Sequence, residues 1–305
     1  MRSAIEPGTK IAGFVSFLDR IDECNRWESA GFRPFIVAGH WVGMVGAGFA
    51  EILSRYADTF CVESDRVTLD DGLVDFEQRS RAVAEALRDI AEDGEIKGWR
   101  GELYPVASGF TEPPLMAMER AAIPRFGIRA YGIHMNGFFG EGEDIEMWIG
   151  RRAGDKQTFP GKFDNMVAGG QPIGIGLMEN LIKECAEEAS IPPELAGRAR
   201  PVGAVSYCAL SEEGLKPDTQ FCYDLRLPPD FVPENADGEI ASFELWPIQK
   251  IMDSVAETQD FKFNCNLVII DFLVRHGLIS PDHCDFLEIV ESLHQSHSIF
   301  EGIQL

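Results

Sequence analysis

Residues 169–191 read GGQPIGIGLMENLIKECAEEASI, a glycine-rich run followed by a stretch with the apolar spacing of a short helix. The dipeptide Pro192-Pro193 follows and predicts where that helix ends, because proline cannot continue it. At about 100° per residue the apolar side chains of the stretch fill one arc of the helix. Glu184, Glu187 and Glu188 have i, i+3 and i+4 spacing and share a separate face.

A face with three glutamates indicates a site for a divalent cation. Uncompensated like charges at this spacing cost a helix a few tenths of a kcal/mol per pair. A hard cation with oxygen ligands, Mg²⁺ or alternatively Mn²⁺, removes that cost. An ordinary solvated acidic face is the competing interpretation, since the chain has a net charge of -23.

The glycine loop, the helix and the carboxylates together resemble the Nudix box, whose pattern is Gly-x5-Glu-x7-Arg-Glu-apolar-x-Glu-Glu-x-Gly-apolar. Counted from Gly169, the match runs to Ile191. The first glutamate of the pattern falls on Ile175, its arginine on Lys183 and its late glycine on Ser190, whereas the three metal-binding glutamates are kept. These departures put the loop geometry in doubt more than the metal site.

A longer resemblance covers nearly the whole chain. It is to the Nudix subfamily that is found alone in bacteria and plants and fused to thiamin pyrophosphokinase in fungi. The segments that carry it are 33–35 (RPF), 98–104 (GWRGELY), 126–137 (FGIRAYGIHMNG), 147–152 (MWIGRR) and 158–170 (TFPGKFDNMVAGG). The resemblance implies an α+β chain, in which a smaller mixed α/β accessory domain (1–124) precedes a Nudix α/β/α sandwich with C-terminal helices (125–305).

The same resemblance implies the site residues. Glu184, Glu187 and Glu188 would bind the metal and carry catalysis, one of them doubling as general base, with the backbone carbonyl near Gly169 as a further ligand. Arg151, Arg152 and Lys162 lie beside the loop and are candidates for binding phosphate oxygens. Trp148 and Phe163, with Trp99 and Tyr104, are aromatic residues that could stack on a heterocycle. Glu239 and Glu244 are secondary candidates for the general base.

The hypothesis is a Mg²⁺-dependent diphosphatase whose partner is a small-molecule diphosphate. By resemblance, the substrates are thiamin diphosphate analogues, the oxo and oxy forms, cleaved to monophosphate and phosphate. A nucleoside diphosphate derivative such as ADP-ribose is the alternative substrate, and a non-catalytic ligand-sensing domain is the alternative class. An isopentenyl diphosphate isomerase is disfavoured, because Val167 and Ala168 stand where its cysteine would be and Gly170 where a histidine ligand would be.

Composition bounds the remaining possibilities. The 305 residues allow two modest domains, and the net charge of -23 disfavours nucleic acid. Seven cysteines without a Cys-x-x-Cys pair predict reduced thiols, and no apolar run is long enough for a signal peptide or a membrane span. A cytoplasmic protein is therefore expected, with a homodimer left open.

Periodicity and turn residues predict the regular elements. The strands are expected as a pair within 35–45 and at 128–138, 145–151, 202–210, 220–227 and 239–245. The helices are expected at 50–56, at 83–91 with a stop at Gly94, in the box, from about 247, and from Ser280 to about 293.

Overall fold

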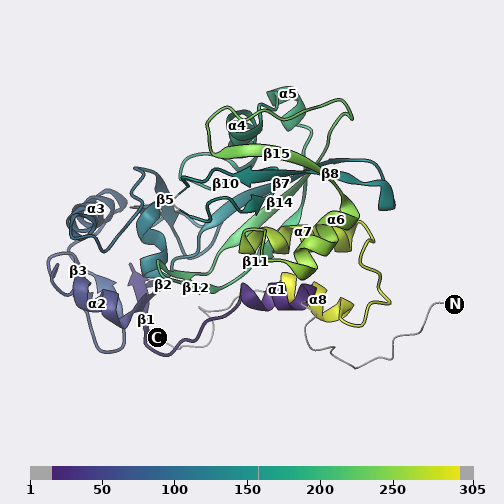
Figure 1. Cartoon of the computed structure of the whole chain (residues 1–305). Coiled ribbons are helices and arrows are strands. Elements are labelled where there is room, and N and C mark those ends of the chain that lie inside the picture. Colours follow the sequence, from purple (N-terminus) through teal and green to yellow (C-terminus); the bar gives the residue numbers. More distant parts are fainter. Residues whose placement is uncertain (1–15, 157, 296–305) are drawn as a thin grey trace.

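The computed structural model describes residues 16–156 and 158–295 (Figure 1). Its centre is a mixed sheet with the strand order β11-β14-β7-β8-β15, to which β10 adds by pairing with β7 and β9 by pairing with β8. The strands are β7 (Tyr131–Phe139), β8 (Glu146–Arg152), β9 (Phe163–Asp164), β10 (Val167–Gly170), β11 (Arg200–Ser206), β14 (Thr219–Arg226) and β15 (Ile240–Pro247). β14 and β7 are parallel, and the other pairs are antiparallel.

Helices cover both faces of this sheet (Figure 1). The box helix α4 (Leu177–Ala189) and the short α5 (Pro193–Ala196) lie on one side, and α6 (Ile248–Glu257) and α7 (Phe263–Arg275) on the other. Strand alternation explains the two layers: Trp148 of β8 faces the α4 core, whereas its neighbours Met147 and Ile149 face the α7 core. The predicted α/β/α sandwich is confirmed.

The first part of the chain forms a smaller mixed α/β unit. Its four-stranded sheet has the order β2-β1-β4-β3 and is joined by a separate β5-β6 ribbon. The elements are β1 (Phe32–Val37), β2 (His40–Gly46), α2 (Ala47–Leu53), β3 (Phe60–Val62), β4 (Val67–Leu69), α3 (Phe76–Glu92), β5 (Leu103–Val106), β6 (Met116–Glu119) and the 3-10 helix η1 (Arg120–Phe126). Phe126 is fully buried in its core, with its ring 4.9 Å from that of Phe35.

Within the described residues, the first helix packs against the last two rather than against this unit. α1 (Phe17–Glu23) contacts α7 and α8 (Phe286–Leu293), and Ile21 is buried in their common core. Arg20 is also buried, and its Nε donates a 2.9 Å hydrogen bond to the Val255 carbonyl. The domain limits at 124 and 125 stay a prediction.

Several expected elements differ in detail. The strand expected at 202–210 is divided between β11 and β12 (Ala209–Ser211), and β12 pairs with β13 (Gly214–Lys216). α8 begins at Phe286, because the residues after Ser280 form turns rather than its first helical turn. Gly169 and Gly170 belong to β10 instead of a loop, which starts after them. Within the described residues no helix has the length and apolar content of a membrane span.

Candidate active site around the box helix

The box helix has the predicted limits. Gly176 is its N-cap, and Ser190 ends it in the left-handed conformation with φ 52°. Glycine adopts that conformation at little steric cost, which explains why the family pattern has glycine there. The local fold is therefore kept despite the serine, at the cost of some backbone strain.

Two of the three glutamates pack against strand β10. The carboxylate of Glu188 is buried and accepts a 2.9 Å hydrogen bond from the Ala168 N–H. Glu184 lies against the next residue, since a Cβ on Gly169 would be 2.6 Å from Glu184 Cδ. The strand backbone thus brings Glu184 and Glu188 together at the position predicted for the metal.

The third glutamate is more exposed and is engaged by a lysine. Lys183 Nζ lies 2.8 Å from Glu187 Oε2 and 3.2 Å from Glu184 Oε1. The three carboxylates do not all lie within 4.8 Å of one another in the described part of the chain. Because Lys183 and Glu187 are each about half exposed, their ion pair is worth at most about 1 kcal/mol, which a divalent cation can exceed.

The electrostatics of the site fit a cation. Burial raises the pKa of Glu188 well above its usual value, and the negative charges of Asp164, Glu184 and Glu239 raise it further against the hydrogen bond from Ala168. Burial likewise raises the pKa of Glu184. Buried acidic side chains resist ionisation, and a bound metal ion stabilises their charged carboxylate form. Glu184 and Glu188 are therefore suitable ligands for a hard divalent cation.

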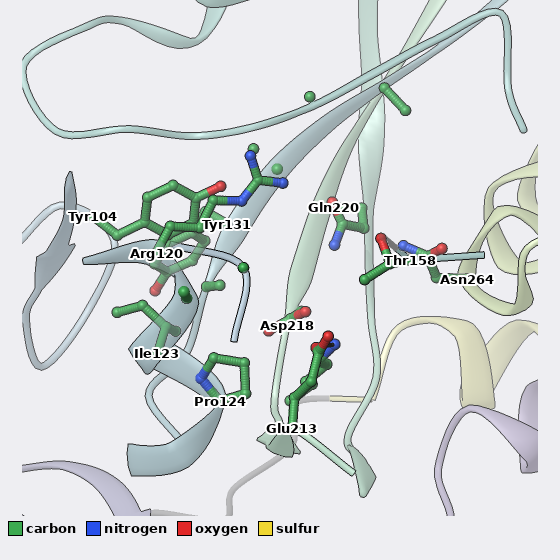
Figure 2. A pocket seen from close by; sticks show the side chains of 18 of the residues that line it. Tyr104, Arg120, Ile123, Pro124, Tyr131, Thr158, Glu213, Asp218, Gln220 and Asn264 are labelled. Carbon is green, nitrogen blue, oxygen red and sulfur yellow. Dashed lines mark hydrogen bonds and ion pairs between the residues drawn. The ribbon is translucent and has the colours of Figure 1, made fainter. Parts of the chain in front are cut away.

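A pocket of about 210 Å³ opens beside β10, and both parts of the chain line it. The smaller unit contributes Lys97, Arg100, Tyr104 and Arg120, while the sandwich contributes the Ala168–Gly170 edge and residues from β7, β14 and α7. In Figure 2 Arg120 and Tyr104 lie on the opposite side of the pocket from Thr158 and Asn264.

Arg120 and Tyr104 are held where they meet the metal-site strand. Arg120 Nη1 forms a 2.7 Å ion pair with Glu102, and its guanidinium lies 5.6 Å from the centre of the Tyr104 ring. A Cβ on Gly170 would be 1.5 Å from the Tyr104 hydroxyl. Any residue larger than glycine at position 170 would therefore clash with Tyr104. Sequence reasoning named Tyr104 as a stacking candidate but missed Arg120, which is distant from the box along the chain.

The predicted phosphate-binding residues lie elsewhere. Arg151 and Lys162 line a separate hollow, where Arg151 stacks 4.1 Å from the Phe163 ring centre and Lys162 donates to the Gln259 carbonyl. Arg152 is largely buried and forms a 2.9 Å ion pair with Asp164. Its other nitrogens donate to the carbonyls of the 158–159 turn, so it supports a wall of the main pocket instead of facing it.

The predicted stacking residues are mostly core residues. Trp148 is 9% exposed and packs in the core under α4, and Phe163 is 5% exposed with its ring 4.6 Å from that of Trp246. Their apolar surface is largely covered by the protein, and the guanidinium of Arg151 lies over the ring of Phe163. Trp99 is exposed and is not part of the pocket lining, so Tyr104 is the aromatic candidate that the structure places there.

The two secondary base candidates differ in their surroundings. Glu244 uses both oxygens within the protein, toward Arg151 at 3.3 Å and Trp246 Nε1 at 3.0 Å. Glu239 pairs with Lys156 and acts electrostatically on both Glu188 and Arg120. Burial opposes ionisation of Glu239, but Lys156 and the charge of Arg100 outweigh it and lower its pKa. Glu239 is therefore an ionised group close to the site.

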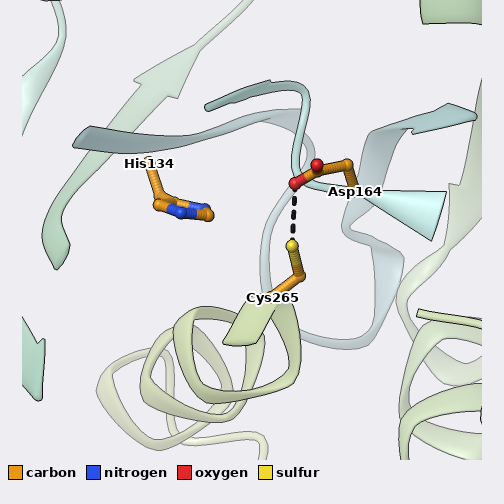
Figure 3. Close-up of side chains that lie close together, drawn as sticks. All are labelled: His134, Asp164 and Cys265. Carbon is orange, nitrogen blue, oxygen red and sulfur yellow. Dashed lines mark hydrogen bonds between the residues drawn. The ribbon is translucent and has the colours of Figure 1, made fainter. Parts of the chain in front are cut away.

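His134, Asp164 and Cys265 form a buried cluster (Figure 3), and His134 of this cluster also lines the pocket. The Cys265 thiol donates to Asp164 at 2.7 Å, and Asn165 accepts from His134 Nδ1 at 2.8 Å. Burial lowers the pKa of His134 to about 4, helped by the charge of Lys262. Arg152 also pairs with Asp164, and the bond from Cys265 to Asp164 joins α7 to β9.

Comparison with known proteins assigns the family. A family model described as "Domain of unknown function (DUF4743)" matches residues 16–130. From Arabidopsis thaliana, "Nudix hydrolase 24, chloroplastic" is 46% identical over 283 residues, and "Nudix hydrolase 20, chloroplastic" is 44% identical over 290 residues. Each alignment covers 92% of this chain and 78% of the relative. The chain belongs to the Nudix hydrolase family and is a hydrolase acting on diphosphate linkages.

Solved structures are less similar to this chain than the two plant relatives are. The Nudix domain of Shewanella oneidensis NrtR, complexed with ADP ribose, has a TM-score of 0.39 at 12% identity and covers 49% of this chain and 90% of its own. The family assignment rests on the two plant relatives, and members of the family use divalent cations.

The expected cytoplasmic location is wrong on the same comparison, because both plant relatives are named as chloroplastic. All seven cysteines are free, as predicted. Reduced thiols indicate a reducing environment, but they do not distinguish one reducing compartment from another, and this is why the inference failed.

Proposed function

We propose that the chain is a Mg²⁺-dependent diphosphatase of thiamin diphosphate analogues, releasing a monophosphate and phosphate. The supporting observation is that Glu184 and Glu188 both pack on the Ala168–Gly169 edge, which is also a wall of the pocket. The thiamin part of the proposal rests on the sequence resemblance to the subfamily fused to thiamin pyrophosphokinase.

The chain's own groups divide the work as follows. Glu184, Glu187, Glu188 and the Gly169 carbonyl would hold the metal, which when bound supplies charge neutralisation and an acidified water. Ala168 N–H keeps Glu188 oriented. Glu187, the exposed member, is the candidate to accept the proton of the attacking water, and Glu239 is the second candidate.

Arg120, instead of the predicted Arg151, Arg152 and Lys162, is the residue proposed to bind the phosphates. It lines the pocket next to Gly170, and a guanidinium binds phosphate oxygens in a fixed planar geometry. Arg100 and Lys97 add positive charge on the same lining. We propose that the accessory unit (1–124) thereby completes the phosphate end of a site whose metal end is in the Nudix domain (125–305).

The same proposal takes a small-molecule diphosphate as partner and excludes nucleic acid. A net charge of -23 repels a polyphosphate backbone, whereas one diphosphate can be held by a metal ion and a few local cations.

The test is phosphate release from oxythiamin diphosphate, thiamin diphosphate and ADP-ribose, with and without Mg²⁺. The double variant Glu187→Gln with Glu188→Gln should lose at least about 100-fold of the Mg²⁺-stimulated rate while keeping its circular dichroism spectrum. Glu179→Gln is the matched control, an exposed glutamate in the first turn of the same helix. Full turnover by the double variant would refute the metal assignment, and a preference for ADP-ribose would refute the thiamin substrate alone.

A further inference from the structure

Side chains from three successive turns of α4 contact three successive residues of strand β10. The pairs, helix residue first, are Glu188 with Ala168, Glu184 with Gly169, and Asn180 with Gly170. Asn180 Nδ2 makes the last of these contacts by donating a 2.8 Å hydrogen bond to the Gly170 carbonyl. Because i, i+4 and i+8 lie on one side of a helix, this asparagine continues the row that the two glutamates begin.

The Asn180 amide belongs to a chain of hydrogen bonds that also holds the glycine loop. Its Nδ2 donates a second bond, of 3.1 Å, to Gln171 Oε1, and Gln171 Nε2 donates to the Ile175 carbonyl at 2.6 Å. Backbone carbonyls at both ends of this chain determine which amide atoms are the donors. The end of β10 and the loop after it are thereby tied to the first turn of α4.

No charged pair can give the loop this support. The box pattern has glutamate and arginine at the positions of Ile175 and Lys183. Ile175 has no charge, and Lys183 forms its ion pairs with Glu184 and Glu187. The amide chain reaches position 175 through its backbone carbonyl, which does not depend on the side chain there.

Both amide side chains are buried, and one of their atoms is unpaired. Asn180 is 0% exposed and Gln171 is 6% exposed. Within residues 16–156 and 158–295 no group donates to Asn180 Oδ1. A buried acceptor without a donor loses hydration free energy that an apolar side chain of similar shape would not lose. Packing alone therefore does not explain an asparagine at this position, whereas the two bonds that it donates do.

We propose that Asn180 and Gln171 are positioning residues for the metal site. They fix the register of α4 on β10, and both Glu184 and Glu188 are carried by that helix. A shift of the helix along the strand would displace the two carboxylates together. The assignment of these glutamates to the metal comes from the proposed function, on which this inference rests.

The experiment measures metal binding and register separately, on the full chain without substrate. Mn²⁺ binding is followed by electron paramagnetic resonance of the free ion, and hydrogen exchange at the Ala168 amide is followed by NMR in metal-free buffer. Asn180→Leu should weaken Mn²⁺ binding by about 10- to 100-fold, as loss of a group that orients a metal ligand does. It should also speed exchange at Ala168 by at least about 10-fold, because this amide donates to Glu188. Gln171→Met is the second variant and should change both quantities in the same direction.

Asn266→Leu is the matched control, because Asn266 of α7 is also a buried helical asparagine with an unpaired Oδ1. It should leave both quantities at their wild-type values, and thermal melts show which variants are folded. Wild-type Mn²⁺ affinity in folded Asn180→Leu and Gln171→Met, or an equal loss in Asn266→Leu, would overturn the inference. Mn²⁺ affinity that is unchanged in Glu188→Gln, together with faster exchange at Ala168 in Asn180→Leu, would retain the register and reject the metal assignment of the proposed function.

Discussion

Replacing Gly169 by alanine tests whether the contact between β10 and Glu184 shapes the metal site. The added methyl would lie 2.6 Å from Glu184 Cδ and Cγ. Ordinary contact begins near 3.4 Å, so the carboxylate must retreat by about 0.8 Å (3.4 minus 2.6). A displacement of this size in a catalytic group typically costs about 100-fold in rate. The backbone φ of Gly169 is not positive, so the change should cost less than about 1 kcal/mol of stability.

The assay is Mg²⁺-dependent phosphate release from oxythiamin diphosphate, with kcat/KM and the Mg²⁺ concentration for half-activation measured together. We expect kcat/KM to fall about 100-fold and the half-activating concentration to rise about 10-fold. Gly176→Ala is the control, because a Cβ there meets no atom within 4 Å. Wild-type values of both quantities in a folded Gly169→Ala variant would refute the assignment of Glu184 to the metal.

Two further predictions concern stability. Arg152→Gln should lower the free energy of unfolding by about 2 kcal/mol in urea titration, because it removes the closer of the two cations paired with the buried Asp164 and leaves Lys262 at 3.8 Å. Arg151→Gln should change it by less than about 1 kcal/mol, and equal effects of the two variants would contradict the structural role of Arg152. Burial lowers the pKa of His134 from 6.5 to about 4, so its imidazole binds more protons in the unfolded chain than in the folded one between these pH values, and His134 should contribute a loss of about 3 kcal/mol of stability as the pH falls from 6.5 to 4. His134→Gln should flatten the profile in this window, and a profile of unchanged slope would contradict it.

The sequence predicts best those helices that are bounded by glycine or proline. Gly176 and Pro192 bound the box helix, and Gly94 follows α3 in a left-handed conformation. α7 was missed for the opposite reason: ten of its residues are buried and it is covered on nearly all sides, so its sequence shows no polar face. Ser280 followed by Pro281 predicts a helix start, but the same pair also suits a turn, and turns follow it in the structure.

The site was predictable only as far as the box reaches. Glu184, Glu187 and Glu188 follow from spacing along one helix, which is local information. Whether Arg151 or Arg152 faces a ligand depends on what covers each side of β8, and strand alternation alone does not tell this. Arg120 reaches the pocket at the start of η1, which packs against β13 of the β12–β13 ribbon, a contact between segments far apart in sequence.

The docking of α1 on α7 and α8 has a consequence for how this chain is made and divided. Residues 17–23 leave the ribosome long before α7 and α8, so Ile21 gains its buried neighbours only after residues 263–293 have been synthesised. The packing of α1 therefore waits for the synthesis of these C-terminal helices. A recombinant fragment that starts at residue 125 would leave the α7–α8 groove bare, so dissecting the two halves requires grafting residues 16–24 back onto the hydrolase half.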